Sequence, residues 1–143
     1  MQATRKTIAF AAASAVFFLS ACGDETGPEG ETQDFSGSYT LHEVSQGTVG
    51  GSLNVLVGST GTFTMTATTY EVSINIPLGQ TNLVDHGTYS AIGTATSGEF
   101  SQQSTDNPDL QYQGTYAWDA ATNRLTLDTS AQGIRTVLVL QKN

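Results

Sequence analysis

The chain has 143 residues, with 5 Lys and Arg against 13 Asp and Glu, so its formal net charge is −8. Beyond residue 6 the only cations are Arg124, Arg135 and Lys142, which are too few and too scattered for the clustered Lys and Arg that phosphate recognition needs. Composition therefore excludes a nucleic-acid partner, and a single cysteine excludes an internal disulfide.

The first predicted element is an export signal over residues 1–21. Arg5 and Lys6 supply a positive start, residues 8–19 are apolar, and small residues stand directly before Cys22. A membrane-spanning helix needs about 20 apolar residues, and this run is shorter. We therefore expect a processed signal rather than a membrane span.

Residues 19–22, Leu-Ser-Ala-Cys, resemble the lipobox of bacterial lipoproteins. The resemblance implies a thioether lipid on Cys22, cleavage before it and acylation of the new terminus, with palmitate as an expected acyl group. Several acyl chains hold a protein stably at a membrane. In some bacteria an Asp directly after the lipidated Cys retains a lipoprotein in the inner membrane, and Gly23 stands there in this chain. The expected location is thus the outer membrane of the cell envelope.

The alternative for Cys22 is an ordinary buried thiol. Residues 23–34 argue against it, because they are acidic, rich in glycine and contain no apolar residue large enough to pack. We expect a flexible tether over residues 22–34. The rest of the chain, residues 35–143, has the length of one compact domain.

A short pattern of glycine, hydroxyl residue and aromatic residue recurs four times within this domain. Its copies stand at residues 37–39, 61–63, 87–89 and 114–116, at offsets of 24, 26 and 27. Each offset matches the length of a two-strand unit. The repeat therefore predicts about eight strands, the number that closes a small antiparallel barrel.

Apolar and polar residues alternate along much of the domain, as expected for half-buried strands. The phase of this alternation changes between Ala67 and Tyr70, which predicts a bulge or tight turn at Thr68 and Thr69. The predicted strands are residues 39–41, 53–57, 63–67, 70–76, 83–92, 98–101, 110–118, 124–127 and 134–140.

The segment 110–118 carries the heaviest stripe of side chains on one strand face. Tyr112, Tyr116 and Trp118 have the same parity, with Gly114 as a gap between them. Such a stripe either lines a pocket for one small apolar ligand or fills the core, since interior side chains alone can occupy a small barrel. Tyr112, Tyr116 and Trp118 are thus the candidate ligand-binding residues, with core filling as the alternative.

The opening segment 35–41 and the strand segments 114–116 and 125–127 resemble the small lipocalin-like domains of bacterial lipoproteins. The resemblance covers about residues 35–141. It implies an all-β, lipocalin-like fold, an antiparallel up-and-down barrel. A two-sheet β-sandwich is the alternative fold.

Candidates for catalysis are few. His42 and His86 each stand beside one acidic residue, but neighbouring residues in a strand face opposite sides, and the two histidines would share a site only if their strands adjoin. The turn with Asp106 and Asp109 supplies too few oxygen ligands for calcium. We expect no enzyme activity, no metal site and no cofactor.

Two functions remain for a lipid-anchored envelope protein of this kind. The first is a non-catalytic binding protein that holds a small apolar ligand in its barrel. The second is a structural or protein-interaction lipoprotein with a filled barrel, similar in size and anchoring to lipoproteins that inhibit lysozyme. Residues 137–140 are apolar on both strand faces, so either another part of the chain covers the outer face or this strand contacts an envelope protein, which would support the second function.

Overall fold

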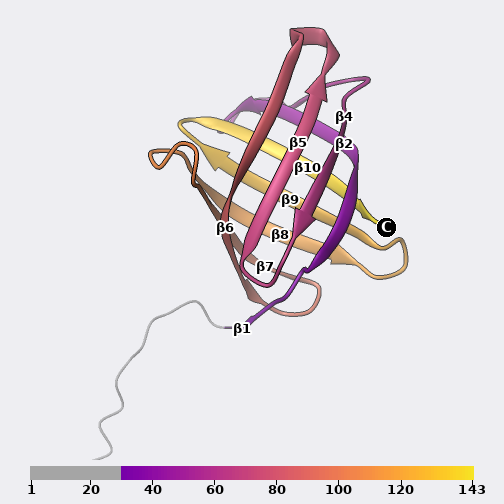
Figure 1. Ribbon diagram of the computed structural model, residues 1–143, viewed down its shortest axis with the longest axis vertical. Helices are drawn as coiled ribbons and strands as arrows, with labels where there is room; N and C mark the ends of the chain where they lie inside the picture. Colours follow the sequence, from indigo (N-terminus) through magenta and orange to yellow (C-terminus); the bar gives the residue numbers. More distant parts are fainter. Residues whose placement is uncertain (1–29) are drawn as a thin grey trace, which may run out of the picture.

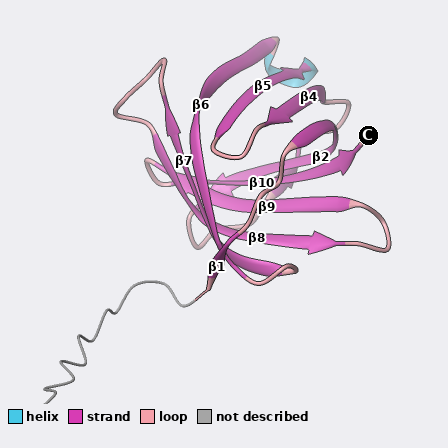
Figure 2. Ribbon diagram, turned by 60° about the horizontal axis from the view of Figure 1, so that its bottom comes forward, coloured by secondary structure: helices cyan, strands magenta, loops and turns pink. Residues whose placement is uncertain are grey.

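The computed structural model describes residues 30–143, which form a closed antiparallel β-barrel (Figure 1 and Figure 2). The predicted signal peptide, Cys22 and the first part of the predicted tether lie outside the described residues. The elements are β1 (Glu31–Thr32), β2 (Gly37–Thr48), β3 (Asn54–Val55), β4 (Thr60–Met65), β5 (Thr69–Ile76), the 3-10 turn η1 (Pro77–Gly79), β6 (Thr81–Gly93), β7 (Ser97–Ser104), β8 (Gln111–Asp119), β9 (Arg124–Ala131) and β10 (Ile134–Lys142).

Eight strands make the barrel wall, and each pairs with the next wall strand along the chain, from β2 and β4 through to β10. The ring closes because β10 also pairs with β2, from Ile134 opposite Thr48 to Lys142 opposite Tyr39. Closure leaves the wall without a free edge. The predicted up-and-down barrel is confirmed, and the alternative of a two-sheet sandwich is wrong because the pairing runs unbroken around the described wall.

The four aromatic residues of the sequence repeat are all buried, as alternation predicts. They lie on β2, β4, β6 and β8. However, β2 and β4 are neighbours in the wall, so the first offset of 24 residues is not a two-strand unit. It spans the long strand β2 and the loop that holds β3. The repeat predicts the right number of strands, but its first interval contains one wall strand and not the two expected.

Two glycines of this repeat lie where neighbouring strands approach closely. A Cβ at Gly114 would overlap the carbonyl oxygen of Asp128 and stand 2.8 Å from the Cα of Thr129. A Cβ at Gly87 would overlap the carbonyl oxygen of Gln103. Glycine allows strands to bend and to approach each other in a small barrel, so these positions let the wall curve into a ring.

The turn predicted at Thr68 and Thr69 is confirmed. Residues 66–68 connect β4 to β5, and the backbone N–H of Thr66 donates to the carbonyl of Thr69 at 2.9 Å. The connection changes the phase, so that Met65 and Tyr70, which pair across the two strands, both face the core. The alternation on each side of the turn therefore points into the same interior.

The half-buried strand predicted over residues 53–57 is wrong. Only β3 pairs there, beside Ser45 and Gln46 of β2. Val55 and Val57 are 51% and 71% exposed. This loop lies at the rim of the barrel, where the described part of the chain provides no layer of side chains for its valines to pack against. Alternation in sequence therefore does not produce a buried face here.

β1 holds the end of the predicted tether against the barrel. Glu31 pairs with Gly93 at the end of β6, and the backbone N–H of Gln33 donates to the carbonyl of Ala91 at 2.8 Å. The side chain of Gln33 adds a hydrogen bond to the carbonyl of Gly93 at 3.2 Å. Residues 31–34, assigned to the tether from composition, therefore lie along the barrel wall.

Phe35 closes the end of the barrel that β1 approaches. Its ring is 7% exposed and lies edge-on to Tyr116, with ring centroids 5.0 Å apart, and 6.4 Å from the centroid of Trp118. The backbone of Phe35 accepts a hydrogen bond from the hydroxyl of Tyr39 at 2.7 Å and donates one to that of Tyr89 at 3.2 Å. This end of the barrel is thus filled by aromatic rings.

Candidate functional site

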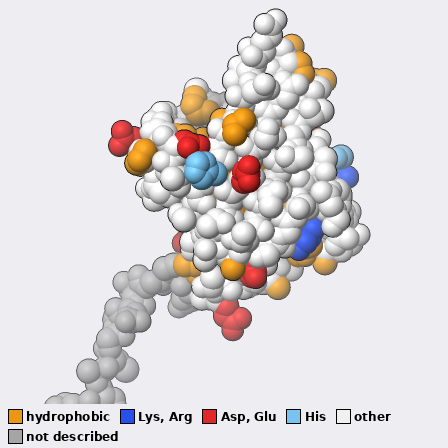
Figure 3. Space-filling model, in the orientation of Figure 1, with side chains coloured by type: hydrophobic (Ala, Val, Ile, Leu, Met, Phe, Trp, Pro, Cys, Tyr) orange, Lys and Arg blue, Asp and Glu red, His pale blue; other side chains and the backbone are white. Residues whose placement is uncertain are grey.

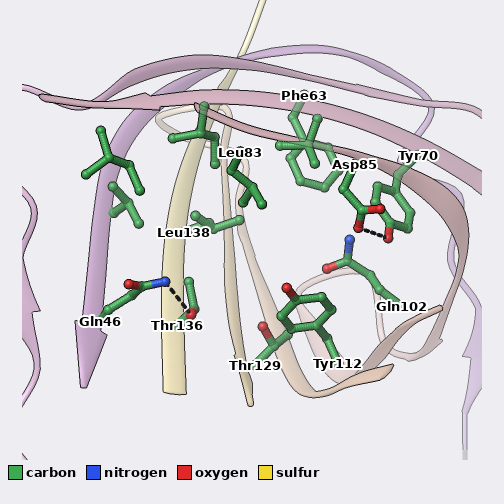
Figure 4. Close-up of a pocket in the computed structure, with 14 residues that line it drawn as sticks. Gln46, Phe63, Tyr70, Leu83, Asp85, Gln102, Tyr112, Thr129, Thr136 and Leu138 are labelled. Carbon is green, nitrogen blue, oxygen red and sulfur yellow. Dashed lines mark hydrogen bonds between the residues drawn. The ribbon is translucent and has the colours of Figure 1, made fainter. Parts of the chain in front are cut away.

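The candidate site is a cavity in the other half of the barrel, away from Phe35 (Figure 4). Its volume is about 60 Å³. The lining residues near the rim are Gln46 at the end of β2, Ile76 at the end of β5 and Thr136 at the start of β10. Leu83, which also lines the cavity, is 38% exposed, so the cavity reaches the surface at the end opposite β1. On this measure of volume a water molecule needs about 10 to 15 Å³, so there is room for a few waters or for one small organic molecule.

One side of the cavity wall is apolar. Val72 and Ile74 of β5, Phe63 of β4, Val44 of β2 and Leu138 of β10 line it. All five are buried and belong to the main hydrophobic cluster. These side chains face inward because they occupy alternate positions of four strands that follow one another around the ring.

The other side of the wall is polar. Asp85 of β6, Gln102 of β7, Tyr112 of β8 and Thr129 of β9 line it, and these four strands are also consecutive in the ring. Asp85, Gln102 and Thr129 are between 4% and 7% exposed. Polar side chains this deeply buried are unusual unless they are paired or face a polar occupant. The cavity therefore has one apolar wall and one wall able to form hydrogen bonds.

Asp85 anchors the polar wall. Its Oδ2 accepts a hydrogen bond from the hydroxyl of Tyr70 at 2.7 Å, and its Oδ1 accepts one from the hydroxyl of Ser104 at 2.6 Å. The backbone N–H of Asn107 in turn donates to the Ser104 hydroxyl at 3.0 Å. The carboxyl group thus connects β5, β6 and β7 and is held in one orientation, with lone pairs left over for a further donor.

Gln102, Tyr112 and Thr129 have unused hydrogen-bonding capacity. Within residues 30–143, the side-chain amide of Gln102 and the hydroxyls of Tyr112 and Thr129 form no hydrogen bond. In Figure 4, no dashed line, which would mark a hydrogen bond, ends on these three side chains. In this part of the chain, every side-chain N or O atom that is fully buried has a hydrogen-bond partner. These three groups must therefore face the open space of the cavity, where a bound molecule or water can pair with them.

The three predicted ligand-binding residues occupy different levels of the barrel. Tyr112 lines the cavity. Tyr116 is 2% exposed at the closed end, where its hydroxyl donates to the carbonyl of Thr94 at 2.6 Å. Trp118 also lies at the closed end, partly buried against Phe35. All three face inward from β8, but only Tyr112 borders this cavity.

The histidines and the acidic turn do not form a site together. His42 and His86 are both exposed and lie on β2 and β6, which are not neighbours in the wall. His86 Nδ1 lies 3.0 Å from Asp106 Oδ2, and both side chains are exposed on the outer surface. Within the described residues, no group of three or more His, Cys, Asp or Glu side chains is arranged to hold a metal ion.

The deeper polar residues of the cavity were not selected from sequence. Asp85 shares the parity of Leu83, Gly87 and Tyr89 on one strand, which places it on the inner face. Gln102 shares the parity of Phe100 in the same way. The signal that identifies them is a polar residue at an inward position of a strand, whereas a search for paired catalytic groups passes over it.

Burial raises the pKa of all five tyrosines, that of Tyr39 to about 12 and that of Tyr70 further, with help from its hydrogen bond to Asp85. The pKa of these phenols is higher in the folded protein than the ordinary 10.0. Their neutral form therefore contributes its full share to the free energy of unfolding below pH 10, and this contribution is lost as the pH rises toward 12. We expect ultraviolet titration to show little phenolate in the native protein at pH 10 and much more in denaturant. Equal phenolate in both states would contradict this expectation.

Comparison of the chain with family models, curated proteins and solved structures found no match. Among residues 30–143, no helix has the length and apolar character needed to span a bilayer.

Proposed function

We propose that the chain is a lipid-anchored, non-catalytic binding protein of the bacterial cell envelope, which holds one small ligand in its lipocalin-like barrel. The observation that carries the proposal is the cavity in which unpaired polar groups of Gln102, Tyr112 and Thr129 face an apolar wall. Ligand sites commonly combine apolar walls with a few placed polar groups that fix orientation.

The lipobox-like residues 19–22 support the anchor, and Gly23 supports the outer membrane. From Cys22 to Gly30, the first described residue, eight residues can span about 28 Å when fully extended. The chain enters the barrel beside the end closed by Phe35, while the cavity lies toward the opposite end. With an anchor at Cys22, the cavity would thus open away from the membrane that holds the protein.

The anchor is tested by replacing Cys22 with alanine in the full-length protein expressed in a lipoprotein-processing bacterium. We expect the wild type to incorporate labelled palmitate and to sediment with membranes, and the C22A variant to do neither. A Ser20→Ala variant, which keeps a small residue before the cysteine, should behave as the wild type. Unlabelled wild-type protein in the soluble fraction would contradict the proposed anchor.

Ligand binding is tested by native mass spectrometry of full-length protein purified gently from its own envelope. We expect a small molecule bound to the wild type and absent from Thr129→Phe, because a phenyl ring at this inward position fills the cavity. Ser130→Phe is the matched control, since Ser130 is the next residue of β9 and faces away from the barrel interior.

A wild-type protein without a bound molecule, or a T129F variant that retains it, would contradict the binding function. Circular dichroism of both variants shows whether the barrel is intact, because overpacking costs about 1 to 3 kcal/mol.

The second candidate is a protein-interaction lipoprotein, and a specific observation favours it. Large apolar side chains are exposed in the loops and strand ends at the cavity end. They are Val49, Val55, Val57, Leu78 and Ile134. Figure 3 shows patches of hydrophobic side chains on the upper part of the molecule. The outward side chains of Val137 and Val139, in contrast, are half-buried between neighbouring strands. A protein that co-purifies with an otherwise empty barrel would favour this candidate.

A further inference from the structure

Asp85 is an acidic side chain in the barrel interior with no cationic partner in the described structure. Both of its oxygens accept hydrogen bonds, from Tyr70 and from Ser104. The Ser104 hydroxyl already accepts from the backbone of Asn107, so its own proton is free to be donated to Asp85. Each oxygen of Asp85 therefore already has a hydroxyl partner and keeps a lone pair for one further donor.

The three cations of residues 30–143 are all engaged elsewhere. Arg135 forms a bidentate pair with Asp128, with the shorter contact at 2.6 Å, and the Nε of Arg124 donates to Gln141 at 3.3 Å. Lys142 lies at the closed end, where its Nζ donates to the carbonyl of Ser36 at 2.9 Å. The carboxylate in the cavity is thus compensated by hydroxyl groups alone.

A buried anion is costly to keep without a positive partner. The neighbours Val72 and Leu83 in the wall are apolar and offer Asp85 no further polar partner. The surrounding charge acts in the same direction, because residues 30–143 hold three cations and ten acidic residues, a net charge of −7. A negative field of this kind attracts small cations to the cavity.

We infer that the ligand of this cavity is a small organic cation, an amine on a short apolar chain, whose ammonium group pairs with Asp85. This inference rests on the binding function proposed above. The ammonium group donates to the Asp85 carboxylate, and the amide oxygen of Gln102 and the hydroxyl of Tyr112 lie on the same wall to accept its other protons. The alkyl part packs against Val72 and Leu138. The cavity volume of about 60 Å³ limits the ligand to a few carbon atoms.

The alternative role for Asp85 is structural, as a link that ties Tyr70 on β5 to Ser104 on β7. The two roles differ in what they require of a ligand. If Asp85 is only a structural link, the affinity of the cavity does not depend on the charge of the bound molecule. If Asp85 is a charge partner, a cation binds more tightly than a neutral molecule or an anion of the same shape.

The test uses three probes with one carbon skeleton: 3-methylbutylamine, 3-methyl-1-butanol and 3-methylbutanoate. Each is titrated by calorimetry into full-length wild-type protein in detergent at low ionic strength. We expect the amine to bind at least tenfold more tightly than the alcohol and the carboxylate not to bind. The same order should appear in the rise of the unfolding temperature at a fixed ligand concentration.

The variant Asp85→Asn keeps the shape of the side chain and removes its charge, and it should lose the preference for the amine. Asp109→Asn removes an equal charge from an exposed position and should keep that preference. If the D85N variant does not fold, the comparison of the three probes on the wild type still decides the question.

Equal affinity of the wild type for amine and alcohol would overturn the inference and leave the binding function standing. A neutral or anionic molecule found bound to protein from its own envelope would overturn it in the same way. If no probe binds and the purified protein carries no molecule, both the inference and the binding function fail.

Discussion

The Gly114→Ala variant is expected to be less stable than the wild type by about 3 kcal/mol or more. The added methyl group would overlap the carbonyl oxygen of Asp128 and stand 2.8 Å from the Cα of Thr129. Both atoms belong to the backbone of β9, so no rotation of a side chain can relieve the overlap, and the two strands must separate. Their pairing includes Gly114 opposite Thr129 itself. Changes that force backbone movement in a packed barrel are among the most destabilising single substitutions.

The measurement is chemical denaturation of the two proteins, followed by circular dichroism. Gly79→Ala is the matched control, because a Cβ at Gly79 in the turn η1 would meet only the flexible side chain of Thr81, at 3.1 Å. We expect that variant to differ from the wild type by less than about 0.5 kcal/mol. A loss below 1 kcal/mol at Gly114 would show that the strands are farther apart there than described.

Strand alternation predicts which side chains face the interior, because the side chains of a barrel strand must alternate between core and solvent. The inward parity of Tyr39, Phe63, Tyr89 and Tyr116 is predicted correctly for this reason. Parity, however, describes only the face of the sheet. It predicts a half-buried strand for residues 53–57 as well, although Val55 and Val57 are exposed and no other element of residues 30–143 covers them.

The odd or even position of a residue in a strand predicts which face it lies on, but not its height along the barrel axis. Tyr112 and Trp118 lie six residues apart on the same face of β8, which separates them by about 20 Å along an extended strand. One borders the cavity and the other packs at the closed end. Deciding between them requires the register of all eight strands, which depends on contacts far apart in sequence.

The polar wall of the cavity is the part of the site that is hardest to predict from the sequence. Asp85 stands next to His86 in the sequence, and adjacent residues that look like a catalytic pair in fact face opposite sides of β6. The inward position of Asp85 follows from the parity of Leu83 and Gly87, but its partners Tyr70 and Ser104 come from other strands. Sequence can thus indicate a buried carboxylate without indicating what surrounds it.

The closed end of the barrel depends on one side chain outside the wall strands, and Phe35→Ala is expected to cost about 3 to 5 kcal/mol in the free energy of unfolding. The ring of Phe35 is 7% exposed and lies against Tyr116 and Trp118. Removing it leaves a cavity bordered by aromatic faces. The backbone hydrogen bonds of residue 35 do not require the ring, so the variant isolates the contribution of packing.

Two comparisons make the result specific. Phe35→Leu, which refills most of the space, should lose less than about 2 kcal/mol, and Leu78→Ala, at a position 76% exposed, should lose less than about 0.5 kcal/mol. Trp118 provides a local signal, because loss of the adjacent ring exposes its indole to water and shifts its fluorescence emission to longer wavelength. A variant F35A as stable as the wild type, with unchanged emission, would show that the barrel end is closed by the wall strands themselves. The expected loss instead makes Phe35, the residue after the predicted tether, a structural part of the barrel that seals the end approached by β1.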